Sequence, residues 1–277
     1  MLEVLSYKFM QNALMAAFLA SIVCGIIGPF IVTRRLVFIS GGISHISFGG
    51  LGIAYWLGIN PLYGATAFSL AAATWIGFSK QDKMSESDLI IGILWAFGMA
   101  IGIIFIHLTP GYAPNLMTFL FGNILTVPRF DIFIISILVL VITLSVLIFY
   151  KGFVSVALDE EYSKARKLPV RSLNIGLLIL IALSIVTLIQ VVGIILVIAL
   201  LTIPVAVAKE FSIHFKKIIL ISILFGISIC LLGLFISYYI EFPSGASIVI
   251  IGSILLGVVK GVKKILKMKL NLDETIN

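Results

Sequence analysis

Charged side chains are scarce in this sequence. Asp, Glu, Lys and Arg make up 11% of its 277 residues, whereas a soluble domain carries about 25%. The 12 acidic residues all lie in polar segments or at the ends of apolar runs, so no carboxylate stands in the middle of a run. A carrier driven by protons or sodium more often places Asp or Glu there. The sequence therefore argues against a carboxylate relay as an energy source.

Cysteine and histidine are also rare, with two and three residues. Cys24 and Cys230 both fall within apolar runs, which indicates neither a disulfide framework nor a metal cluster. The sequence contains no G-x-x-x-x-G-K-[ST] loop, no H-E-x-x-H and no C-x-x-C pair. It therefore lacks the phosphate-binding loop of an ATPase and common zinc motifs, and we do not expect the chain to be an enzyme by itself.

Apolar residues dominate instead, at 61% of the chain against about 45–50% in soluble domains. Several runs reach the roughly 18 residues that are typical of a membrane span. We predict an all-α, polytopic membrane bundle of about eight or nine transmembrane helices, with no room for a sizeable soluble domain. The net charge of +7 then reflects membrane topology, and no nucleic-acid partner is expected.

Nine apolar segments are candidate spans. They comprise residues 9–32, 37–59, 62–78, 89–108, 131–150, two arms within 173–208, 218–240 and 246–259. The 36 residues from Leu173 to Ala208 would form about 54 Å of helix, which is too long for one span. We therefore predict a tight hairpin near Gln190 and Gly193. Residues 115–127 are too few to cross and are predicted to form a re-entrant or interfacial segment.

The basic residues predict an orientation. With the N-terminus outside and the C-terminus in the cytoplasm, 17 of the 19 Lys and Arg residues lie on the cytoplasmic side, and Lys8 and Arg129 lie outside. Such an asymmetry follows the rule that cytoplasmic loops are rich in Lys and Arg. The longest polar segment, residues 151–171, is cytoplasmic in this arrangement. Acidic residues lead and basic residues follow within it, which favours a short helix.

The second span carries an unusual polar face. Gly41, His45, Gly49 and Gly52 fall on one side of a helix, and Ser40, Ser44 and Ser47 form the adjacent row. Small residues allow close approach of a helix or a substrate, and an ionisable residue within a membrane span is by default a functional candidate. Two interpretations stay open: an ion path past His45, or a glycine and serine packing seam in which His45 bonds to a neighbouring helix.

Several segments in order along the chain resemble the permease subunit of metal-ion ABC importers of the zinc, manganese and iron group. They are 10-MQNAL-14, 39-ISGGISH-45, 91-IGIL-94, 121-FGNIL-125, 159-DEEYSKARKLPVR-171, 190-QVVG-193 and the stretch from 237-SYY to 243-PSG-245. The resemblance implies one transmembrane permease domain over residues 1–277 in the plasma (inner) membrane of a prokaryote. It also implies a second copy of the chain, an ABC ATPase subunit that binds the ATP, and an extracytoplasmic metal-binding protein.

The resemblance also implies roles for individual residues. Residues 151–171 correspond to the loop that docks on the ATPase, with Asp159, Glu160, Glu161 and Arg166 as docking residues. The helix motif of the family reads G-D-A-L-S-H, and this chain matches its His at His45 but has Gly41 at the position of its Asp. The expected path is lined by Gly41, Ser44, His45 and Gly49, with His45 as the metal ligand.

The loss of the carboxylate bears on which ion is carried. Imidazole suits Zn²⁺, while carboxylate oxygens suit Mn²⁺ better, so we expect transported zinc first and manganese or iron second. The chain itself is expected to bind no resident cofactor. Two other functions remain open: a permease for metal chelates of the cobalamin or siderophore type, and a self-sufficient cation channel or secondary carrier.

Overall fold

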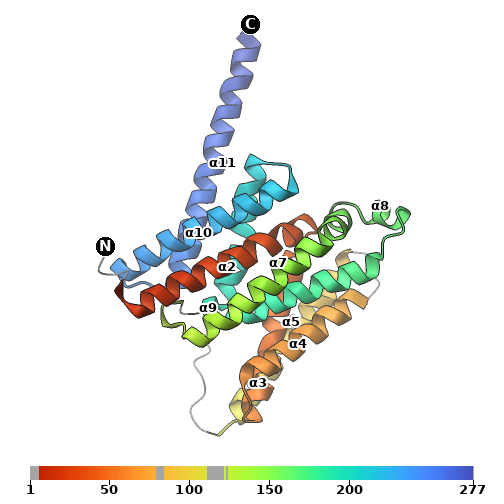
Figure 1. The fold of residues 1–277 in the computed structure, drawn as a ribbon, viewed down its shortest axis with the longest axis vertical. Helices are drawn as coiled ribbons and strands as arrows, with labels where there is room; N and C mark the ends of the chain where they lie inside the picture. The colour runs from red at the N-terminus through yellow and green to blue at the C-terminus, as the bar shows by residue number, and fades with distance from the viewer. Residues whose placement is uncertain (1–5, 79–83, 111–121, 123, 277) are drawn as a thin grey trace.

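The computed structural model of this chain describes residues 6–78, 84–110, 122 and 124–276 (Figure 1). The helices in this part are α2 (Lys8–Thr33), α3 (Val37–Trp56), α4 (Pro61–Phe78), α5 (Met84–Leu108), the 3-10 turn η1 (Ile124–Thr126), α7 (Arg129–Leu158), α8 (Glu160–Ala165), α9 (Val170–Phe211), α10 (Phe215–Ile240) and α11 (Ser244–Ile276). The described residues contain no strand. The predicted all-α membrane bundle is confirmed, because eight of these helical segments are long and apolar enough to cross a membrane.

Helix α2 lies at the centre of the bundle and packs against α7, α9 and α10 (Figure 1). Its small alanines allow this close packing, and Ala13, Ala16 and Ala20 are fully buried. Near its C-terminal end the ring of Phe30 contacts both Phe153 of α7, at 6.2 Å between centroids, and Phe215 of α10, at 4.8 Å. That end of α2 therefore lies beside the end of α7 and the start of α10.

Helix α9 breaks and reverses near its middle, as predicted. Gly193 has φ 79° and ψ 162° inside the 42-residue element, which is a conformation that a side chain disfavours. A straight helix of that length would separate its ends by about 63 Å. Instead both ends lie near Phe30. A Cβ added to Gly152, the neighbour of Phe153, would lie 3.1 Å from the Leu173 side chain at the start of α9, and Phe215 follows closely after the end of α9. The two arms, Val170–Ile189 and Val191–Phe211, are separate candidate spans.

The described part of the segment predicted to be re-entrant lies against this break. Residues 124–126 form η1, and the side-chain amide of Asn12 donates to the carbonyl of Val127 at 3.1 Å. The backbone of Gly122 approaches Val192 and Gly193 so closely that an added Cβ would lie 2.2 Å from the Val192 carbonyl carbon. Residues 115–121 and Asn123 lie outside the described residues.

Helices α3 and α4 form a hairpin whose two outer ends lie at the same side of the bundle. The start of α3 follows Arg34, which pairs with Glu160, and the end of α4 lies beside α9, where the Arg171 guanidinium sits 4.8 Å from the Phe78 ring. Helix α4 has 18 residues and is outside the group of eight candidate spans, although this arrangement carries it across the same depth as α3. The geometry therefore fits the predicted range of eight to nine spans.

Backbone contacts at glycines hold α3 between α4 and α5. A Cβ added to Gly50 would lie 2.1 Å from the carbonyl oxygen of Gly64 on α4. On the α5 side, a Cβ at Gly49 would lie 2.8 Å from the Gly98 oxygen, and one at Gly52 would lie 2.5 Å from the Gly102 oxygen. Helices in lipid associate through such close packing of small residues, so these glycines fix which faces of α3 meet its two neighbours.

We expect Gly50→Ala to destabilise the protein by about 1–3 kcal/mol, because the new methyl group meets backbone that can only move by separating two helices. Gly92→Ala on α5 is the matched control, since no described residue lies within 4 Å of its added Cβ and alanine favours a helix by up to about 1 kcal/mol over glycine. Thermal unfolding of both variants in detergent measures the difference. Equal midpoints would refute the close α3–α4 contact.

Candidate functional site

His45 lies near the middle of α3 on the face that meets α5. The backbone of α5 comes close here, because a Cβ at Gly98 would lie 3.1 Å from the His45 carbonyl oxygen and 2.5 Å from the Cα of Ile46. The His45 side chain itself is only partly buried. The glycine seam thus places an imidazole between two helices while leaving part of the ring accessible.

Two side chains of α5 fix the orientation of this ring. The imidazole of His45 stacks on the indole of Trp95, with 4.0 Å between ring centroids and 13° between ring planes. Its Nδ1 lies 3.4 Å from the sulfur of Met99. Trp95 and Met99 are four residues apart and therefore lie on the same side of α5. In the sequence both residues look like ordinary apolar residues of a membrane span.

The Met99 contact determines which ring nitrogen is free. A thioether sulfur has no proton to donate and acts only as a weak acceptor. In this contact Nδ1 must therefore carry the proton and donate a hydrogen bond to the Met99 sulfur. The neutral ring then keeps its lone pair on Nε2. A histidine that binds a metal ion commonly has its second nitrogen occupied in this way. The arrangement leaves Nε2 as the nitrogen of His45 suited to bind a cation.

Gly41 lies one turn before His45 and faces the same indole. A Cβ at Gly41 would lie 3.4 Å from the nearest atom of the Trp95 ring, so a small side chain would be in close but tolerable contact. The structure therefore brings Gly41 and His45 together beside Trp95. The position where the related motif has Asp is therefore buried beside Trp95 and offers no side-chain ligand atom.

Ser44 and Gly49 are placed differently. Ser44 is fully buried, and its hydroxyl donates to the carbonyl of Ser40 at 2.9 Å. Gly49 lies against the backbone of Gly98. Within one chain both residues thus take part in helix packing, and their place on the ion path remains a prediction.

The donor set around His45 is incomplete within a single chain. Among the residues that the structure describes, no three His, Cys, Asp or Glu side chains come together to hold a metal ion. His107 at the end of α5 and His214 before α10 are both exposed and lie on other parts of the chain. His45 supplies one donor, so the other three ligands of a four-coordinate ion would have to come from elsewhere, such as water or a second copy.

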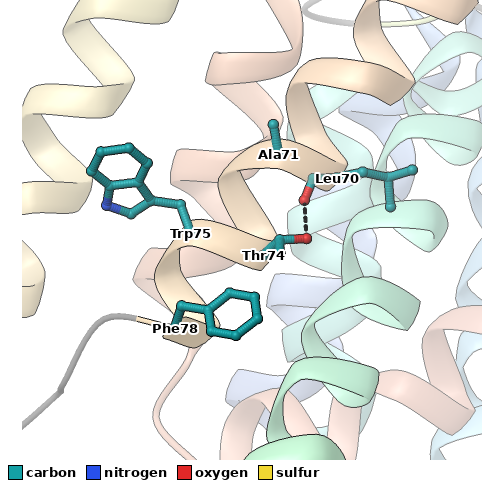
Figure 2. Close-up of a pocket in the computed structure, with 5 residues that line it drawn as sticks. All are labelled: Leu70, Ala71, Thr74, Trp75 and Phe78. Carbon is teal, nitrogen blue, oxygen red and sulfur yellow. Dashed lines mark hydrogen bonds between the residues drawn. The ribbon is translucent and has the colours of Figure 1, made fainter.

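A hollow of about 600 Å³ lies on the surface of α4. Figure 2 shows the residues that line it, which are Leu70, Ala71, Thr74, Trp75 and Phe78. The Thr74 hydroxyl donates back to the carbonyl of Leu70 at 2.6 Å, so it is occupied within its own helix. Trp75 is 67% exposed. This lining is typical of a helix face in contact with lipid and offers no charged group to a cation, so we do not assign it to an ion path.

The predicted docking segment contains a short helix, α8, although α7 first continues for about two turns past Tyr150 to Leu158. Asp159 caps the start of α8, where its carboxylate accepts a hydrogen bond from the Tyr162 amide at 2.9 Å. Such a cap satisfies an amide that the helix cannot. Ser163 is buried and bonds to Ser155 at 2.8 Å. These contacts give the segment a defined shape.

The charged residues of α8 divide into two groups. Glu160 faces the bundle, where one carboxylate oxygen lies 3.6 Å from the Arg34 guanidinium. Glu161 faces away, with its side chain 85% exposed, and among the described residues it pairs with Lys164 of the same helix at 2.9 Å. The Arg166 guanidinium lies 5.8 Å from the exposed Tyr162 ring. Asp159 and Glu160 thus shape the segment, while Glu161, Tyr162 and Arg166 form its outer surface.

Electrostatic effects agree with this division. Hydrogen bonds to Glu161 and Glu160 raise the pKa of the Lys164 ammonium, which keeps it charged. Burial lowers the pKa of the Arg34 guanidinium, and the neighbouring Glu160 carboxylate opposes that change. Arg34 also donates to the side-chain oxygen of Asn174 on α9. Arg34 therefore joins α8 to the bundle, a role that its position after the first span did not reveal.

These features define an all-helical, multi-pass membrane protein with one imidazole in a glycine-rich helix and a shaped polar segment at one side. The profile of the ABC 3 transport family matches residues 6–261, and the chain belongs to this family. The resemblance found in the sequence motifs is thereby confirmed.

Individual relatives cover nearly the whole chain. It is 36% identical to the manganese transport system membrane protein MntC of Listeria innocua over 91% of this chain and 89% of MntC. It is 34% identical to the manganese import system permease protein ScaB of Streptococcus gordonii over 90% of this chain and 89% of ScaB. A solved structure of PsaBC from Streptococcus pneumoniae in complex with a Fab superposes with a TM-score of 0.85 at 34% identity, covering 97% and 98% of the two chains.

Proposed function

We propose that this chain is the membrane permease of an ABC importer that carries a divalent transition-metal ion into the cell. The observation that carries the proposal is the oriented imidazole of His45 inside a membrane helix of a chain that matches the ABC 3 transport family over residues 6–261. The whole chain, residues 1–277, forms one permease domain. Two copies work with two ATPase subunits and receive the ion from an extracytoplasmic metal-binding protein.

In this proposal the ion passes His45 and binds it briefly. Nε2 supplies one neutral donor, and the His45 of a second copy supplies another if the two α3 helices approach across a two-fold axis. Two imidazoles leave the usual fourfold shell of Zn²⁺ half filled, so water or backbone oxygens near Gly41, Ser44 and Gly49 complete it. Weak and incomplete binding suits a path, because an ion must also leave.

Manganese is our first choice of cargo. MntC and ScaB are named for manganese, and the similarity to them extends over at least 90% of this chain. Zinc is the second choice and rests on one local observation. Beside His45 the chain has Gly41 where a carboxylate would favour manganese, and an imidazole nitrogen without such a carboxylate suits zinc better than manganese.

The variant Gly41→Asp tests how this position selects the ion. A carboxylate one turn before His45 adds a hard oxygen ligand, so we expect the ratio of manganese to zinc uptake to rise by about tenfold, given the preference of Mn²⁺ for such ligands. Gly41→Asn is the matched control because it has the same shape without the charge. Uptake of both ions from an equimolar mixture gives the ratio. An unchanged ratio in Gly41→Asp would remove Gly41 from the path.

The orientation with the N-terminus outside is also part of the proposal. It places Lys164 of α8 in the cytoplasm and Ile59, in the exposed turn between α3 and α4, outside. A cysteine at Lys164 should react with a membrane-impermeant maleimide only after the cells are opened, and a cysteine at Ile59 should react in intact cells. The native Cys24 and Cys230 are buried and should stay unlabelled. The reverse pattern would overturn the orientation.

A further inference from the structure

A second cavity lies between α7 and α10, and its lining residues do not belong to α3 or α5, the helices of the His45 site. It has a volume of about 960 Å³, and its walls come from α2, α7, α10 and the start of α9. Along its length the lining is mostly apolar, with Ile26, Val146, Leu147, Ile219 and Ile223 among its residues. From Thr143 to Lys151 it follows α7 for about 12 Å, and from Lys216 to Ile223 it follows α10 for about 10 Å.

One end of this groove is basic. Lys151 of α7 and Lys216 of α10 both line it, and the Lys216 ammonium lies 5.4 Å from the ring of Tyr150, so both lysines are at the same end. In the part of the chain that the structure describes, neither lysine lies within ion-pair distance of a carboxylate. Two cations therefore stand together over an apolar groove without an anionic partner from the protein.

We propose that this groove binds one anionic phospholipid, with its phosphate between Lys151 and Lys216 and an acyl chain along the apolar walls. The charge of the two lysines complements a phosphate, and basic pockets between transmembrane helices on the cytoplasmic side are typical sites for anionic headgroups. The apolar lining requires an acyl chain, which distinguishes a lipid from a free phosphate. The positive-inside arrangement places the lysine end at the cytoplasmic leaflet, where a headgroup lies.

The bound lipid also touches the segment that carries α8. Leu168 and Pro169, which link α8 to α9, line the same end of the groove. An acyl chain in the groove contacts Leu168 and Pro169, and the headgroup lies between the ends of α7 and α10. The lipid thus helps to hold the position of α8, without direct contact with Glu161 or Arg166.

Native mass spectrometry of the full chain in detergent tests the site with phosphatidylglycerol and phosphatidylcholine of identical acyl chains. We expect phosphatidylglycerol to be retained in preference. Each lysine should contribute about fivefold to retention, so that Lys151→Gln with Lys216→Gln lowers it by roughly 25-fold. Lys209→Gln with Lys217→Gln is the matched control, because both are exposed lysines outside the groove and the change in net charge is the same.

A second pair of variants tests the acyl chain separately. Leu147→Trp fills the apolar part of the groove and should lower retention while both lysines remain, whereas Leu140→Trp, on an exposed site of the same helix outside the groove, should not. Both parent leucines are exposed, so the bundle should fold in either variant.

Five results would overturn the proposal. Equal retention of the two lipids, or unchanged retention in the lysine or Leu147→Trp variants, would show that the groove does not select the lipid. Displacement of phosphatidylglycerol by an equal concentration of glycerol phosphate would show a headgroup site without an acyl chain. A disulfide between two chains carrying Leu147→Cys in membranes would show that a second copy fills the groove.

Discussion

Replacing His45 by alanine is expected to lower metal uptake by about 100-fold while the chain still inserts and folds. The physical reason is the loss of the Nε2 donor, since even the residues that support a metal ligand cost 10–100-fold when they are removed. His45→Asn should be nearly as severe, because an amide keeps the polarity and approximate size but cannot replace the imidazole nitrogen. Uptake of manganese and zinc by cells that depend on this importer measures both variants.

Variants of Met99 are expected to lower metal uptake less than His45→Ala does. Met99→Leu keeps the apolar volume but removes the acceptor at Nδ1, so the ring is no longer held in one tautomer and uptake should fall by about tenfold. Met99→Gln restores an acceptor and should recover part of the loss. If His45→Ala transports normally, His45 belongs to the packing seam. If His45→Ala is inactive and Met99→Leu is normal, only the tautomer argument fails.

The double variant Glu161→Ala and Arg166→Ala is expected to uncouple the permease from its ATPase. Both side chains belong to the outer surface of the docking segment, and Glu161 is 85% exposed, so their loss leaves the Asp159 cap and the Arg34–Glu160 pair intact. Desolvated charged contacts at an interface commonly cost 2–5 kcal/mol when truncated, enough to lower assembly by about 30-fold or more. Co-purification of the ATPase and its stimulated ATP hydrolysis give the two measurements.

Arg129→Ala is the control for this variant, because Arg129 is an exposed arginine that the orientation places on the opposite side of the membrane. It should leave assembly unchanged. Normal assembly and normal stimulated hydrolysis in the double variant would remove α8 as the docking element.

The spans and their breaks were largely predictable from the sequence. Runs of apolar residues give span length directly, and a 36-residue run from Leu173 to Ala208 had to reverse, which Gly193 does with a backbone conformation suited to glycine. The order of acidic and basic residues after Asp159 also predicted the short helix α8. The predicted ends of the helices were less accurate. For example, α7 continues past its predicted end at Tyr150 as far as Leu158.

The partners of each helix face could not be predicted in the same way. Periodicity shows that Gly41, His45 and Gly49 share a face, but in lipid no hydrophobic force indicates which helix covers it. Trp95 and Met99 are ordinary apolar residues of a membrane span until α5 is placed beside α3. The pairing of Arg34 with Glu160, 126 positions later in the sequence, likewise required the fold.

The most direct test of the account is ATP-driven metal uptake by proteoliposomes that contain this chain and its ATPase. We expect the purified complex to contain two permease and two ATPase subunits and to accumulate manganese, or zinc, only when ATP and the metal-binding protein are both supplied on their correct sides. Transport of a free metal ion by this chain alone, without ATP or the ATPase, would contradict the account and indicate a channel or secondary carrier. ATP-driven transport of a metal chelate but not of the free ion would contradict it equally.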